Sequence, residues 1–151
     1  MSRWMPTLLW MATIWMLSAR GQSGEDSGYL LASLLAWLGN PEGTDPYARL
    51  VVHAAARKLA HFGAFAVLAL LALRATGSGR ARHAWGLAVA WAILDEWHQS
   101  FVLGRSGNPR DVMIDAAGAT WAMWGLWIHL RLSRPLGRPA GPHPVRGAGP
   151  S

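Results

Sequence analysis

The chain has 151 residues, of which 52% are hydrophobic and only 15% are charged, whereas a soluble domain usually carries roughly a quarter charged residues. The net charge is +6, but the basic residues flank apolar stretches, which indicates attraction to anionic lipid and argues against nucleic acid as a partner. The absence of cysteine excludes disulfides, thiolate metal sites and cysteine catalysis. Ten tryptophans favour a protein that meets membrane interfaces.

The first apolar stretch, residues 4–19, carries no charge and lies near the short end of the roughly 17–25 residues that a bilayer crossing requires. A cleaved signal peptide is the alternative, because Arg3 precedes the stretch. The many tryptophans and the poor cleavage site favour a retained helix. Residues 29–38 are too few to cross, so they predict an interfacial or re-entrant helix.

Three further spans are predicted at residues 58–73, 84–103 and 109–130, and residues 46–57 extend the second helix beyond the bilayer. The predicted fold is therefore all-α, an integral membrane bundle of about four transmembrane helices with an additional interfacial or re-entrant helix after the first. No internal repeat is evident.

The start of the last span carries local signals of its own. Asn108 caps free amides, Pro109 suits the first helical position, and Asp111 falls at the capping-box position. We leave open whether Asp111 also binds a ligand or is only a helix cap.

Residues 1–131 form the predicted transmembrane domain, with its motif core at 57–125. Residues 132–151 are rich in proline, glycine and arginine, which predicts a disordered basic tail.

Arginines set the predicted orientation. Arg74, Arg80 and Arg82 lie between the second and third spans, Arg3 precedes the first span, and further arginines lie in the tail. By the positive-inside rule this side is cytoplasmic. We therefore expect a multi-pass protein of the cytoplasmic membrane with both termini in the cytoplasm.

The eight acidic residues all fall on the opposite, outer side of this topology. Four lie in the first loop, Asp95 and Glu96 lie in the third span, and Asp111 and Asp115 lie at the start of the fourth. A carboxylate within a span costs on the order of 2.5–3.5 kcal/mol on insertion scales, so Asp95 needs a partner or water.

Helical periodicity gathers the polar residues on three faces. In the third span they form one arc opposite Trp97 and Phe101, and in the fourth a stripe of small residues at Gly118, Ala122 and Gly125 favours close packing. Turning these faces inward predicts one outer cavity. Its residues are Lys58, His61, Asp95, Glu96, His98, Gln99, Arg105 and Asp115.

Three linked motifs run through this region: R-K-L-A-H-F at residues 57–62, D-E-W-H-Q-S-F at 95–101, and G-R-S-G-N-P-R-D-V-M-I-D-A-A-G at 104–118. In order and spacing they resemble the VanZ-like family, named after a membrane protein associated with low-level teicoplanin resistance. The resemblance implies a compact bundle of four or five membrane helices, a retained first helix and a link to resistance, but no reaction. Phe65 stands where the family usually has tyrosine. The recurring family positions fall on Lys58, His61, Phe62, Asp95, Glu96, Gln99, Phe101, Arg105, Asp111, Asp115 and Gly118.

The favoured function is binding of a cell-envelope or lipid-linked ligand at the outer face, with Lys58 and Arg105 holding phosphate or carboxylate. The predicted ligand-binding residues are Lys58, His98, Gln99, Arg105, Asp111 and Asp115. The partners expected are the bilayer and this ligand, and the oligomeric state is left open.

A membrane-embedded hydrolase or transferase acting on an envelope lipid is the alternative. Glu96 or Asp95 would be the base, and His61 or His98 the acid or proton carrier. A metal variant would use Asp95, His98 and His61, but no metalloenzyme motif occurs, so no metal or other cofactor is predicted. A proton or solute pathway is disfavoured, because the inner halves of the second and third spans contain no ionisable group.

Overall fold

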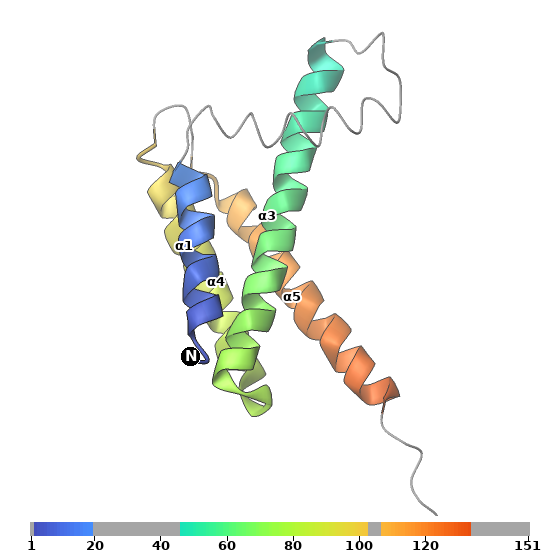
Figure 1. Cartoon of the computed structure of the whole chain (residues 1–151). Coiled ribbons are helices and arrows are strands. Elements are labelled where there is room, and N and C mark those ends of the chain that lie inside the picture. The colour runs from blue at the N-terminus through green and yellow to red at the C-terminus, as the bar shows by residue number, and fades with distance from the viewer. Residues whose placement is uncertain (1, 20–45, 103–106, 134–151) are drawn as a thin grey trace, which may run out of the picture.

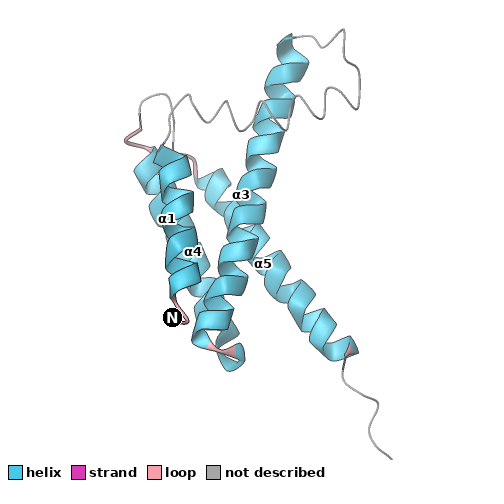
Figure 2. Ribbon diagram, viewed as in Figure 1, coloured by secondary structure: helices cyan, strands magenta, loops and turns pink. Residues whose placement is uncertain are grey.

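A computed structural model of the chain describes residues 2–19, 46–102 and 107–133. These residues form four α-helices and no strand, which confirms the predicted all-α class (Figure 2). The predicted helix at 29–38, Arg105 and the tail from residue 134 lie outside the described residues. The helices are α1 (Met5–Ala19), α3 (Pro46–Thr76), α4 (Ala81–Gln99) and α5 (Pro109–Leu132), with a short 3-10 turn, η1 (Ser78–Arg80), before α4.

Helices α3, α4 and α5 pack against one another, and α1 is added against α3 and α4. In Figure 1, α1 lies beside α4, whereas α3 and α5 cross each other obliquely. The most extensive packing is between α3 and α5, and α1 contacts both α3 and α4. The 31 residues of α3 give it a length of about 46 Å, so its first turns project beyond the other helices (Figure 1). The predicted extension of the second span back to residue 46 is confirmed.

The helix ends follow from local chemistry. The Asn108 side chain accepts a hydrogen bond from the Arg110 backbone amide at 3.1 Å, and Pro109 occupies the first turn, as predicted. The predicted capping box is wrong in one respect. The backbone amide of Asn108 donates to Glu96 of α4, which leaves the Asp111 carboxylate for other partners.

The third predicted span is four residues too long at its end, because α4 stops at Gln99 and not at residue 103. The backbone amides of Phe101 and Val102 bond three residues back, to the carbonyls of His98 and Gln99. This tighter turn ends the α-helix.

Small residues bring the helices together. Ala88 and Ala92 of α4 are fully buried against Phe65 and Leu68 of α3. Gly118 of α5 lies on the backbone of α3, and the interface leaves no room there for a side chain. The contact at Gly118 confirms the predicted close packing there, whereas Gly125 of the same predicted stripe has nothing within 4 Å of an added Cβ.

Hydrogen bonds between helices supplement this packing. Thr7 and Trp10 of α1 donate from their side chains to the backbone carbonyls of Leu71 and Ala64 in α3, at 3.1 and 2.9 Å. Trp85 of α4 donates to the Thr120 hydroxyl of α5 at 3.0 Å. Each bond satisfies a polar group on an otherwise apolar helix surface.

Among the described helices, one segment, Ala54–Thr76, is both long and apolar enough to cross a membrane. The apolar α1 has only 15 residues, about 22 Å of helix. Charged residues lower the apolar character of α4 and α5, including Asp95 and Glu96 in α4.

Gly118 supplies the first test. A Cβ at this position would overlap the Phe62 carbonyl oxygen and lie 2.8 Å from its carbonyl carbon, so Gly118→Ala must push α3 and α5 apart. We expect the free energy of unfolding in detergent to fall by about 2 kcal/mol. Gly125→Ala is the matched control, because a Cβ there meets nothing within 4 Å. Equal stability of the two variants would contradict the packing described here.

Candidate functional site

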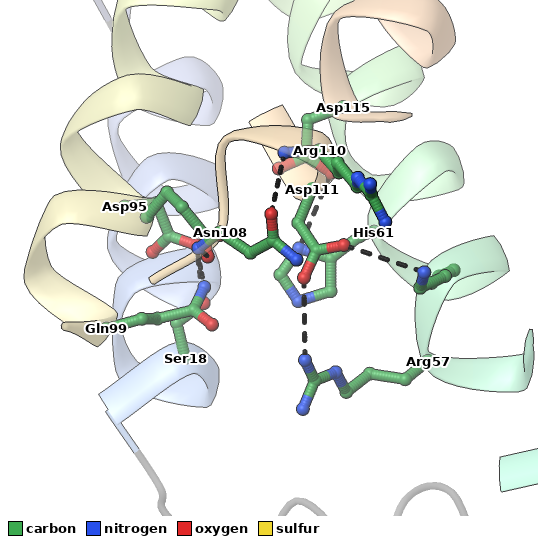
Figure 3. Close-up of polar contacts among 11 residues, drawn as sticks. Ser18, Arg57, His61, Asp95, Gln99, Asn108, Arg110, Asp111 and Asp115 are labelled. Carbon is green, nitrogen blue, oxygen red and sulfur yellow. Dashed lines mark hydrogen bonds and ion pairs between the residues drawn. The ribbon is translucent and has the colours of Figure 1, made fainter. Parts of the chain in front are cut away.

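The polar residues converge at one end of the bundle. The last turns of α1 and α4, the first turns of α5 and the middle of α3 meet at this end (Figures 1 and 3). The structure divides the predicted single cavity into two groups that share Gln99. One group lines a cavity between α3, α4 and α5, and the other joins α1 to α4.

The cavity is small and strongly polar. The volume open to the centre of a water molecule is about 10 Å³, room for roughly one water. Its lining residues are Arg57, Lys58, His61, Glu96, Gln99, Asp111, Ile114 and Asp115. Five of the predicted cavity residues, Lys58, His61, Glu96, Gln99 and Asp115, therefore lie around one space.

His61 and Asp115 form the deepest pair in the cavity. His61 Nδ1 lies 3.5 Å from Asp115 Oδ1, and the Asp115 side chain is only 1% exposed. Asp115 lies one turn before Gly118, and His61 directly precedes Phe62. The close crossing of α3 and α5 therefore places the carboxylate beside the imidazole. Both carboxylate oxygens of Asp115 and His61 Nδ1 are buried, and none of these three atoms makes a hydrogen bond of standard geometry with a described residue.

Two cations stand at the mouth of the cavity. Arg57 Nη2 lies 3.7 Å and Lys58 Nζ 3.8 Å from the two carboxylate oxygens of Asp111 (Figure 3). Their side chains are 46% and 50% exposed, whereas Asp111 is 18% exposed. These long, half-exposed ion pairs are weak, so both cations are accessible to another anion.

Glu96 of α4 lines the cavity and joins α4 to the start of α5. It is 6% exposed, and its Oε1 accepts the Asn108 backbone amide at 2.5 Å. Gly107 lies tightly against the end of α4, where a Cβ would come within 2.9 Å of the Glu96 carbonyl oxygen. The start of α5 is thus held against α4 by a charged hydrogen bond.

The second group, which we call the α1–α4 clasp, consists of Ser18, Asp95 and Gln99. Asp95 is completely buried, and its Oδ2 accepts hydrogen bonds from Ser18 Oγ at 2.7 Å and Gln99 Nε2 at 2.9 Å (Figure 3). The partners of this buried acid are therefore a hydroxyl and an amide, not a cation. Asp95 does not line the cavity.

His98 also lies away from the cavity. Its ring stacks on Trp15 of α1 with centroids 4.0 Å apart and an interplanar angle of 19°. The prediction that His98 joins the shared cavity is wrong, because α1 covers that face of α4. The metal grouping of Asp95, His98 and His61 is not assembled, and within the described ranges no three histidine or acidic residues are placed to hold a metal ion.

Sequence reasoning missed three contributors. Arg57 was not among the predicted cavity residues, although it adjoins Lys58 in the first motif. Ser18 and Trp15 lie in an apolar helix for which no site residue was predicted, although Ser18 bonds to Asp95 and Trp15 stacks on His98. The available signal was the hydroxyl of Ser18 near the end of that helix. Arg105 lies outside the described residues.

The family model described as VanZ/LLP1 matches residues 4–131, which is most of the chain. The chain belongs to the VanZ/LLP1 family. The match includes α1 and all three helices of the cavity, so the resemblance read from the motifs is confirmed. No curated protein and no solved structure matches the chain.

The clasp supplies the second prediction. Ser18→Ala removes one of two hydrogen bonds to a buried carboxylate, so we expect the free energy of unfolding to fall by about 1–3 kcal/mol. Ser100→Ala is the matched control, because the exposed Ser100 hydroxyl bonds only to the nearby Trp97 carbonyl. We expect a change within about 0.5 kcal/mol there. Thermal unfolding in detergent compares the two, and a neutral Ser18→Ala would show that the clasp is not stabilising.

Proposed function

We propose that this VanZ-family protein is a multi-pass membrane bundle in which all four described helices cross or enter the bilayer. The supporting observation is the distribution of polarity. The acids Asp95, Glu96 and Asp115 are at most 6% exposed, whereas Trp97, Trp121 and many other large apolar side chains are about half exposed or more. In water such an apolar surface would be costly, but hydrocarbon is a good solvent for it.

The proposed orientation places both termini and the η1 turn in the cytoplasm and the cavity at the outer face of the cytoplasmic membrane. It rests on the arginines around η1 and at the termini. The short α1 and the polar ends of α4 and α5 would be accommodated by tilt, interfacial tryptophans and the buried pairing of their acids.

Single-cysteine accessibility tests this topology cleanly, because the natural chain has no cysteine. We expect Ser2→Cys, Ser78→Cys and Ser133→Cys to react with an impermeant thiol reagent only after the cells are opened. Ser100→Cys, at the end of α4, should react in intact cells. Labelling of Ser78→Cys and Ser100→Cys from the same side would refute the proposed crossing of α4.

We further propose that the outer face binds an anionic cell-envelope or lipid-linked headgroup. The observation that carries this proposal is the pair of half-exposed cations, Arg57 and Lys58, which share the single carboxylate of Asp111. The other acids lie deeper, Asp115 beside His61 and Glu96 on a backbone amide. An approaching phosphate therefore meets the cations first, and the guanidinium can bind it in a bidentate manner.

The cavity itself holds about one water, so the headgroup would lie over the mouth and not inside it. Its acyl or prenyl chain would remain in the bilayer, beside the exposed aromatic residues of α4 and α5. Sequestering or altering such an envelope component is our proposed basis for a link to glycopeptide resistance.

Binding to a short-chain lipid phosphate, farnesyl diphosphate, tests the cation pair. In detergent, Arg57→Gln should weaken binding measured by calorimetry about tenfold or more, because it removes a charge-assisted hydrogen bond. Arg80→Gln, an exposed arginine at the opposite end of the bundle, is the matched control and should leave binding unchanged. Equal affinity of both variants, or equal binding of uncharged farnesol by the natural protein, would contradict the proposed headgroup site.

A further inference from the structure

The pairing of His61 with Asp115 gives the cavity a chemical capacity beyond binding. Asp115 Oδ1 lies 3.5 Å from His61 Nδ1, and a carboxylate beside this nitrogen favours the orientation in which the other nitrogen, Nε2, exchanges a proton. His61 and Asp115 both line a space that accommodates about one water, and the Asp115 carboxylate is buried there. The half-exposed cations lie at its mouth.

We infer that this site hydrolyses the terminal phosphate of a lipid phosphate or diphosphate, with His61 as the general base, Asp115 as its positioning residue, and Arg57 and Lys58 as the phosphate-binding groups. This inference rests on the proposed headgroup site. It assigns a reaction to His61 and Asp115, which lie beneath the two cations of that site. The size of the cavity supports it, because the phosphate stays outside over the cations while a water occupies the space beneath it.

The step balances with water as the only co-reactant. The water oxygen forms a bond to phosphorus while its proton passes to His61 Nε2. The bond from phosphorus to the bridging oxygen breaks, and that oxygen keeps the electron pair. His61 then returns its proton to the bridging oxygen, which leaves the site as found. Arg57 and Lys58 stabilise the charge on the phosphoryl oxygens during the step.

The structure also decides between the candidate bases. Asp95 is held by Ser18 and Gln99 outside the cavity, and His98 is stacked on Trp15. Glu96 lines the cavity, but its Oε1 accepts a hydrogen bond from the Asn108 backbone amide. This bond holds the Glu96 side chain against the loop before α5. His61 is therefore the one histidine among the described residues that both lines the cavity and contacts a buried carboxylate.

The experiment measures phosphate released by the full-length protein in detergent from two substrates, phosphatidic acid and farnesyl diphosphate. Release from one, the other or both identifies the source of the phosphate group. We expect His61→Gln to lower kcat at least a hundredfold. Asp115→Asn should lower kcat at least tenfold with little change in KM, since it affects only the orientation of the base.

His83→Gln is the matched control. This exposed histidine lies at the start of α4, near the opposite end of the bundle, and we expect it to retain full activity. Thermal unfolding of each variant separates loss of chemistry from loss of fold. If His61→Gln unfolds, His61→Asn replaces it.

Binding and release are measured on the same preparations, so the two proposals fail separately. Farnesyl diphosphate or phosphatidic acid that binds in an Arg57-dependent manner without phosphate release would overturn the hydrolase and leave the headgroup site intact. Absence of both binding and release would overturn both. Release that persists unchanged in folded His61→Gln would also overturn the assignment.

Discussion

The close contact of Gly118 with the Phe62 backbone is the constraint on which the rest of the structure depends. It sets the crossing of α3 and α5, the most extensive helix interface of the bundle. His61 lies next to Phe62 in the chain, and Asp115 lies one turn before Gly118, so this crossing determines that the two side chains meet. A larger residue at position 118 would push α3 and α5 apart, and this would also increase the distance between His61 and Asp115.

The polar end of the bundle contains two groups that differ in how tightly their charges are paired. On the α1 side, Asp95 Oδ2 accepts short hydrogen bonds from Ser18 and Gln99, and the bond from Ser18 joins α1 to α4. On the α5 side, the groups are loosely paired: the ion pairs to Asp111 are 3.7 and 3.8 Å long. Gln99 belongs to both groups. Tight pairing suits a structural contact, whereas loosely paired and accessible charges suit a binding surface.

Periodicity and local signals were enough to predict the helices. The starts of the last helix at Pro109 and of the long second helix at Pro46 were right, and so was the placement of the exposed Trp97 and Phe101 opposite the polar arc. The end of α4 was wrong, because the apolar run F-V-L continues beyond the tightened turn that stops the helix. The capping box was wrong because a side chain of another helix, Glu96, takes the amide that a local rule assigns to Asp111.

By itself the sequence determined the family, the all-α class and the gathering of polar residues on three helix faces, because these depend on motif spacing and on the helical repeat of 3.6 residues. Only the tertiary structure decided how those residues are divided. Asp95 and His98 contact Ser18 and Trp15 of α1 and lie outside the cavity. The crossing of α3 and α5 at Gly118 places Asp115 beside His61. A helical wheel gives the direction of a side chain from its own axis, but not which neighbouring helix covers it.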